Sequence, residues 1–192
     1  MRQLLKVFVL VLVVCFAKAA TVDSLPYFQK QNFGLSIGLG ILSANAGDTY
    51  QGQVGSQGSL SGLYYLGRGH IIGLGIGTQL PALSSGMLHY PLFVQYQYFF
   101  KGRPSVKAGI KAGYSFSSVN VERNIYEAEG GIMVEPFVGI KINNSSEWAW
   151  NFELGLLHQQ LRYQIGDIDV TGNQEEQDWK LWRFVFRTTI EL

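Results

Sequence analysis

The sequence predicts an all-β fold: an eight-stranded antiparallel up-and-down transmembrane β-barrel that follows a cleaved signal peptide. Three observations lead to this prediction. The chain begins with a short apolar run behind basic residues, the rest alternates with a period of two, and the connections between alternating segments are alternately short and long. After residue 20 no run is long and apolar enough to span a membrane as a helix, so insertion would require a barrel.

The first residues have the three parts of a secretory signal. Arg2 and Lys6 are basic, residues 7–16 are apolar, and residues 17–19 read Ala-Lys-Ala, a pattern of signal cleavage sites. The apolar run is too short for an anchor helix, the alternative interpretation. Cys15 follows two valines instead of the small residues that precede a lipidation site. The expected organisation is a signal peptide at 1–19, a lead-in at 20–31 and a barrel domain at 32–192.

The composition of the mature segment excludes several classes of function. It has no cysteine, so neither a disulfide framework nor a thiolate metal site is expected. Three of the 15 basic residues lie in the signal, which leaves 12 against 14 acidic residues and a net charge of about −2. A nucleic-acid partner would require a strongly basic surface, so none is expected. No cofactor is expected either.

The alternation is clearest at 33–41, where five large apolar residues alternate with glycines and a serine. Successive side chains of a strand point to opposite faces, so one face is apolar and the other nearly bare. Similar alternation predicts eight strands, at 32–42, 57–66, 70–80, 89–100, 105–117, 130–142, 148–164 and 179–192. Pro91 and Pro136 fall inside two of them, where a bulge or a local break in pairing is expected.

The connections sort by length. Short turns at 67–69, 101–104 and 143–147 alternate with longer connections at 43–56, 81–88, 118–129 and 165–178. Membrane barrels place short turns on the periplasmic side and long loops outside. They also concentrate aromatic residues at both edges of the apolar band. The expected girdle consists of Tyr98, Phe100, Trp148 and Trp150 at the periplasmic edge, with Tyr90, Phe116 and Tyr163 at the outer edge.

The last strand alternates up to the final residue, with Trp182, Phe184, Phe186, Thr188, Ile190 and Leu192 on one face. Together with the signal and the strand pattern, this resembles the small outer-membrane barrel group that includes OmpX and the OmpA transmembrane domain, over essentially the whole mature chain. The resemblance implies a Gram-negative cell outer membrane, with its lipids, lipopolysaccharide and barrel-assembly machinery as partners. That family usually ends in phenylalanine, and Leu192 departs from it.

With the apolar face toward lipid, the charges of the last four strands must point into the lumen. They are Lys107, Lys111, Glu135, Lys141, Glu153, Arg183, Arg187 and Glu191. The number of residues from each turn places Lys111 at a similar depth to Glu135, and Glu153 at a similar depth to Arg187, on neighbouring strands. Two ion pairs are therefore predicted, Lys111 with Glu135 and Glu153 with Arg187. Because an eight-stranded barrel is only wide enough for its own side chains, these pairs are expected to close the lumen.

The expected function is a structural or surface-interaction role in envelope integrity or adhesion, with the loops at 43–56, 118–129 and 165–178 contacting an extracellular partner. The last loop carries five acids, interpreted as a solvated face near lipopolysaccharide and its divalent cations, not as a metal site. They are Asp167, Asp169, Glu175, Glu176 and Asp178.

Two alternatives stay open. One is a lipid-modifying enzyme, for which His70, His89 and His158 are the available bases and His89, near Ser84 and Ser85, is the least unsuitable. No catalytic residue is predicted. The other is a soluble lipocalin-like carrier with the apolar face inward, which the sparsely charged opposite face disfavours.

Overall fold

The computed structural model describes residues 33–43, 54–81, 87–100, 105–118, 125–143, 148–166 and 174–192. The predicted signal peptide and lead-in lie outside these residues. Within them, no helix is long and apolar enough to cross a membrane.

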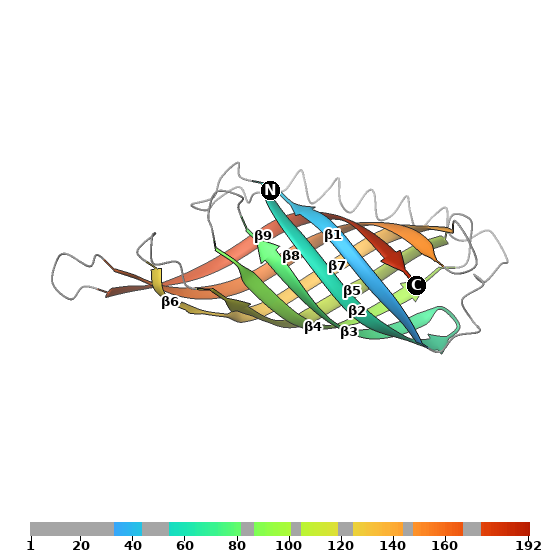
Figure 1. The fold of residues 1–192 in the computed structure, drawn as a ribbon, viewed down its shortest axis with the longest axis horizontal. Coiled ribbons are helices and arrows are strands. Elements are labelled where there is room, and N and C mark those ends of the chain that lie inside the picture. The colour runs from blue at the N-terminus through green and yellow to red at the C-terminus, as the bar shows by residue number, and fades with distance from the viewer. Residues whose placement is uncertain are drawn as a thin grey trace.

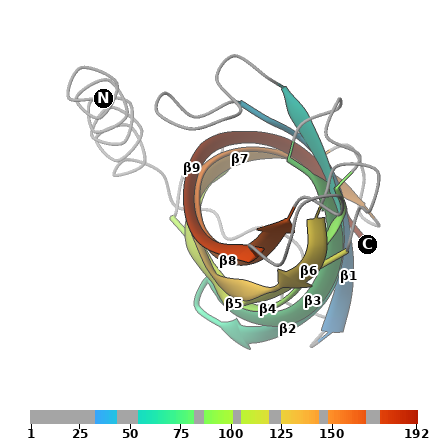
Figure 2. The ribbon, with the colours of Figure 1, turned by 90° about the vertical axis from the view of Figure 1, so that its left-hand side faces the viewer.

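All described elements belong to one antiparallel sheet. Its strands are β1 (Phe33–Leu42), β2 (Gly55–Gly67), β3 (His70–Leu80), β4 (His89–Phe99), β5 (Ser105–Ser117), β6 (Ile125–Glu129), β7 (Gly131–Asn143), β8 (Ala149–Gly166) and β9 (Gln174–Glu191). β1 pairs with β9 and closes the sheet into a barrel, seen end-on in Figure 2. β6 and β7 both pair with β8, so they are two pieces of one barrel strand and the barrel has eight strands, as predicted.

The β8–β9 hairpin extends beyond the rest of the barrel. Both strands have 18 residues and pair from Ala149↔Glu191 to Gly166↔Gln174. Together with β6 they form the projecting end in Figure 1. Much of the predicted loop at 165–178 and the end of that at 118–129 are therefore strand. Alternation of apolar residues could not reveal this, because backbone pairing at the projecting end of a barrel does not require an apolar face.

Both prolines interrupt pairing on one side only. Pro91 pairs with Ser115 of β5, while pairing with β3 is broken between Ile76↔Leu92 and Gln79↔His89 in an unchanged register. Pro136 pairs with Ile110, and its break lies on the β8 side, again without a shift. A proline lacks one N–H, so it loses one ladder and keeps the other. Of the two expectations, the local break is observed and the bulge is not.

Register shifts occur elsewhere: between Tyr65 and Gly67 of β2, between Ile125 and Glu127 of β6, and between β6 and β7. Glu129 pairs with Arg162, whereas Met133 pairs with Gln159, so Gly130 and Gly131 take up an extra residue. A Cβ at Gly131 would overlap the carbonyl oxygen of Gln160. Only glycine permits this close approach of two backbones.

Alternation sorts side chains between lumen and exterior. On β9, Trp182, Phe184 and Phe186 are 36–48% exposed, whereas the intervening Arg183, Val185 and Arg187 are 1–2% exposed. Large apolar residues of the other strands likewise cover the exterior, among them Leu39, Leu74 and Ile132. The barrel is therefore apolar outside and charged inside, the reverse of the lipocalin arrangement.

Candidate functional site

The charged side chains of the lumen come from one half of the barrel wall. β5, β7, β8 and β9 contribute them, whereas β1 to β4 contain no Asp, Glu, Lys or Arg. They are the eight residues that alternation assigned to the lumen, each at most 4% exposed: Lys107, Lys111, Glu135, Lys141, Glu153, Arg183, Arg187 and Glu191.

Six of these residues form one continuous series of ion pairs, here called the charge chain. In order they are Lys141, Glu191, Lys107, Glu153, Arg187 and Glu135. Nitrogen–oxygen distances are 2.8 Å for Lys141–Glu191, 3.2 Å for Glu191–Lys107 and 2.7 Å for Lys107–Glu153. Buried charges need such partners, because each ion loses several kcal/mol of hydration.

Arg187 links the last two carboxylates of the charge chain. Its Nη2 lies 2.6 Å from Glu153 Oε2 and 2.7 Å from Glu135 Oε1, and its Nε donates a hydrogen bond of 2.7 Å to Glu153. A planar guanidinium presents several donors in one fork, which suits it to bridge two carboxylates. A Cβ at Gly38 would lie 3.1 Å from Arg187 Cδ, so the glycine-rich β1 leaves room for this side chain.

The structure brings Glu153 and Arg187 together as the sequence predicted, as Cα partners and as an ion pair. The predicted pair of Lys111 with Glu135 needs correction. These residues are Cα partners, but the Glu135 carboxylate meets Arg187, which reaches it past the intervening β8. Counting residues from the turns therefore predicted the backbone register correctly. The long side chain of Arg187 determined which cation pairs with the Glu135 carboxylate.

Lys111 lies between aromatic rings. Its Nζ is 5.0 Å from the Phe93 centroid and 5.7 Å from that of Phe137. Among the residues that the structure describes, it has no carboxylate within the 4.0 Å limit of an ion pair. Cation–π contacts are weaker than a buried ion pair, so Lys111 is stabilised less than its neighbours.

Apolar groups occupy much of the remaining lumen. A buried cluster on β2, β3 and β4 comprises Leu63, Ile71 and Phe99, and Nζ of Lys141 lies 5.1 Å from the Phe99 ring centroid. A second cluster lies toward the outer end and comprises Leu42, Phe93, Met133, Leu157 and Val185. The lumen also contains buried amides, and side-chain atoms of Gln57, Gln79, Gln97, Asn151 and Gln159 lack hydrogen-bond partners in the described part of the protein. Such amides can bind water or another small polar molecule.

No protein-family model and no curated protein matches this sequence. Solved structures do match its fold. The Neisserial surface protein A (NspA) superposes with a TM-score of 0.62 at 11% identity, over 84% of this chain and 97% of NspA. OprG from Pseudomonas aeruginosa superposes with a TM-score of 0.59 at 10% identity, over 83% of this chain and 95% of OprG.

The chain has the fold of the small eight-stranded outer-membrane β-barrels. At this level of identity the likeness concerns the fold alone. The predicted resemblance to small outer-membrane barrels and the predicted eight-stranded antiparallel barrel are confirmed, and no subfamily is indicated.

Several predicted girdle residues of this barrel pack in pairs. At the end with short turns, Tyr98 meets Phe100 edge-on at 4.9 Å and Trp148 meets Trp150 at 5.9 Å between centroids. At the other end, Tyr90 and Phe116 are exposed on the outer face. Tyr163 lies in β8, but its side chain is outside the described residues.

Other aromatic pairs were not predicted from the sequence, for example Phe33–Tyr64 at 4.9 Å and Tyr114–Phe116 at 5.1 Å between centroids. Phe33 and Tyr64 are Cα partners on adjacent strands. Cross-strand register is the signal that could have found this pair.

The three histidines lie on three different strands, with His70 on β3, His89 on β4 and His158 on β8. His70 hydrogen-bonds through Nδ1 with the Tyr96 hydroxyl at 2.8 Å, and His158 stacks on Trp182 at 4.2 Å. His89 is buried in the lumen near its outer end, where its Nδ1 is 2.8 Å from Ser117 Oγ. Ser84 and Ser85, considered with His89 as an enzyme site, lie outside the described residues.

The five acids do not form a single loop. Glu175, Glu176 and Asp178 are on β9, whereas Asp167 and Asp169 lie outside the described residues. Asp178 pairs with Arg162 Nε at 3.0 Å, and Arg162 Nη1 is 3.6 Å from Glu129. This exposed cluster sits on the projecting β6–β8–β9 end. Among the described residues, no group of three or more His, Cys, Asp or Glu could hold a metal ion.

Proposed function

We propose that this protein is exported to the outer membrane of a Gram-negative cell, with residues 1–19 removed, and that its barrel has a structural or surface-interaction role. The observation that supports this is the inside-out distribution of residues: the exterior of the barrel is apolar and its buried lumen contains the charge chain. Membrane barrels require an apolar outer band, and outer-membrane lipids and the barrel-assembly machinery are the partners that this location implies.

Density-gradient fractionation of cells that express the protein tests the location. The expected result is recovery with outer-membrane markers after removal of the signal peptide. Recovery in the soluble periplasmic fraction would contradict the proposal and revive the ligand-carrier alternative.

We propose that the lumen is closed to ions. The charge chain joins side chains of β5, β7, β8 and β9, and apolar clusters occupy the lumen beside it. Eight-stranded barrels have an interior only just wide enough for side chains. A planar-bilayer recording of the pure folded protein is expected to show no steady conductance. Large, steady conductance would overturn this part of the proposal.

The projecting β6–β8–β9 end, with its exposed ion pairs, is the proposed contact surface for envelope integrity or adhesion. Lipopolysaccharide and an extracellular partner are the candidate ligands. Replacing residues 167–173 with a two-residue turn should reduce cell adhesion or detergent resistance while leaving the barrel folded. The matched control is an equivalent change at 144–147, in a short turn at the opposite end. Equal effects of both changes would argue against a specific role for the projecting end.

No enzyme activity is proposed. The alternative, a lipid acyl hydrolase or transferase, would rest on the His89–Ser117 contact. Incubating the folded barrel with lipid A or phospholipid tests it. Product formation that disappears in the His89→Gln variant would favour the enzyme.

A further inference from the structure

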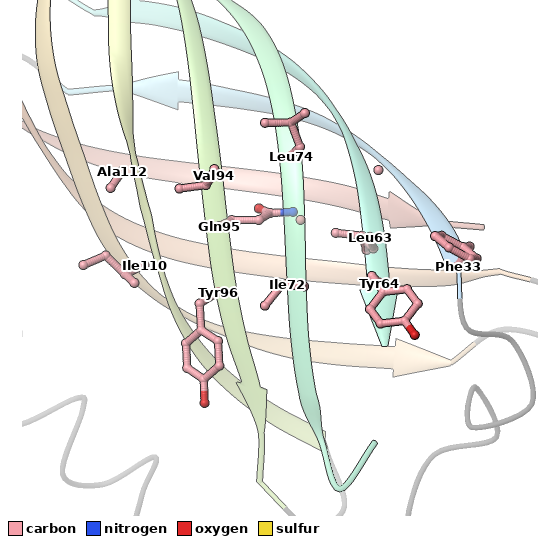
Figure 3. Close-up of a pocket in the computed structure, with 13 residues that line it drawn as sticks. Phe33, Leu63, Tyr64, Ile72, Leu74, Val94, Gln95, Tyr96, Ile110 and Ala112 are labelled. Atoms are coloured by element: carbon pink, nitrogen blue, oxygen red, sulfur yellow. The ribbon is translucent and has the colours of Figure 1, made fainter. Parts of the chain in front are cut away.

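The lipid-facing wall of the barrel contains a groove that none of the functions above uses. It has a volume of about 640 Å³ and crosses β1 to β5. Figure 3 shows Tyr64 and Tyr96 near the end with the β2–β3 turn, and Leu74, Val94 and Ala112 further along the wall. The side chains that line it on the outer face are apolar or aromatic.

Strand register explains why the wall is hollowed here. Two rows of outward-facing residues run side by side across the five strands. The row nearer the turn is Phe33, Tyr64, Ile72, Tyr96 and Ile110, and the next row is Leu35, Gly62, Leu74, Val94 and Ala112. Gly62 and Ala112 are the small members of the second row. A Cβ at Gly62 would meet nothing within 4 Å, so Gly62 leaves open space between larger side chains.

The turn end of the groove is polar and basic. The Tyr96 hydroxyl is held by His70, and exposed Arg68 follows in the β2–β3 turn, where φ is positive at Gly67, Arg68 and Gly69. The sequence places Lys101 and Arg103 in the next short turn, between β4 and β5. By contrast, residues 143–147 at the third short turn include a glutamate and no basic residue.

We propose that this groove binds one acyl chain of an anionic glycerophospholipid from the periplasmic leaflet. The chain lies along Gly62 between Tyr64 and Leu74, and the phosphate lies at the level of Arg68 and His70. An apolar channel in a lipid-facing wall excludes water, and a basic end complements a phosphate charge. The inference rests on the proposed membrane location, because a soluble barrel would not meet such a lipid.

A lipid fits this groove better than a second copy of the chain. A stable protein contact requires about 800 Å² on each partner with good complementarity. Here the wall is hollow, with the tilted Phe33–Tyr64 pair along one side. A flexible chain can follow such a hollow, whereas the convex wall of another barrel would leave it unfilled.

Native mass spectrometry of the folded barrel with dioleoylphosphatidylglycerol tests the proposal. The wild type should retain one lipid through release from detergent, in preference to dioleoylphosphatidylcholine. Gly62→Phe fills the groove and should lower retention about tenfold, as expected from the loss of two buried methylenes. Gly58→Phe is the matched control, on the same strand and outward face but outside the groove, and should retain the lipid. Arg68→Gln should reduce the preference for phosphatidylglycerol.

Each contrary outcome is informative. No retained lipid, or equal loss in the Gly62→Phe and Gly58→Phe variants, would overturn the site. Equal retention of the two lipids would overturn the anionic specificity. A dimer that Gly62→Phe dissociates would identify the groove as a contact between copies.

A heat-modifiability gel establishes folding of each variant, so a failure of the proposed membrane barrel is distinguished from a failure of the groove. If Gly62→Phe does not fold, a phosphatidylglycerol with a photoactivatable chain should label the wild type at the groove and not at Gly58.

Discussion

Replacing Arg187 with methionine tests the charge chain most specifically. The variant loses the contacts of 2.6 and 2.7 Å to Glu153 and the contact of 2.7 Å to Glu135. Glu153 keeps Lys107 at 2.7 Å, whereas Glu135 has no other ion pair among the described residues. Removing one member of a buried pair typically costs ~3–5 kcal/mol, because a buried charge is left uncompensated. We expect about 3 kcal/mol, since only one carboxylate is orphaned.

A second substitution separates the orphaned charge from the lost packing. Adding Glu135→Gln to Arg187→Met removes the uncompensated charge, so the double variant should regain about 1–2 kcal/mol of the loss. Lys111→Met is the contrasting control. Because Lys111 has aromatic neighbours and no carboxylate within ion-pair distance among the described residues, this change should alter stability by no more than about 1 kcal/mol.

The assay is urea unfolding of the barrel reconstituted in vesicles, followed by tryptophan fluorescence and by gel mobility without boiling. An Arg187→Met variant as stable as the wild type would refute the reasoning, as would a double variant less stable than the single one. If Lys111→Met were as destabilising as Arg187→Met, the pairing of Lys111 with Glu135 first predicted from the sequence would be correct after all.

Three further predictions concern other parts of the barrel. Gly131→Ala should destabilise the barrel by several kcal/mol or prevent folding, because the new Cβ overlaps the Gln160 carbonyl oxygen. Gly62→Ala should be nearly neutral, because a Cβ there meets no atom within 4 Å. The temperature at which half of the protein loses its gel mobility shift would compare the two variants. Leu39→Lys, at a position 71% exposed on the outer wall, should cost ~2–4 kcal/mol in vesicles if this site lies near the bilayer midplane, and a cost near zero would argue against lipid contact there. Arg162→Gln should change stability by less than about 1 kcal/mol, since its ion pairs are exposed; a loss in urea unfolding as large as that of Arg187→Met would contradict this.

Much of the fold follows from the sequence because each barrel strand has one apolar face on the exterior and one face toward the lumen. The two faces produce the alternation at 33–41. The same alternation allowed residues such as Lys107 and Glu191 to be assigned to the interior. Counting from short turns also paired Lys111 with Glu135 and Glu153 with Arg187 correctly in backbone register.

Other features depend on interactions that alternation does not encode. Arg187 reaches Glu135 across β8, so cross-strand neighbours alone do not identify ion pairs. Residues 174–178 at the start of β9 read Gln-Glu-Glu-Gln-Asp and lack apolar alternation, so the sequence predicted a loop where backbone pairing with β8 forms a strand. The bulge at Gly130 and Gly131 reflects backbone approach to β8, whereas proline, the residue expected to cause one, only interrupts a ladder. The groove arises from the alignment of Gly62 with larger side chains on neighbouring strands.

The central claim is that the chain is a membrane barrel with an apolar exterior and a charged, buried lumen. A heat-modifiability gel of outer membranes from expressing cells tests it most directly, by comparing boiled and unboiled samples after detergent extraction. A folded membrane barrel should migrate as a compact species when unboiled, and boiling should shift its mobility. A detergent-independent soluble protein with the same mobility in both samples would contradict it.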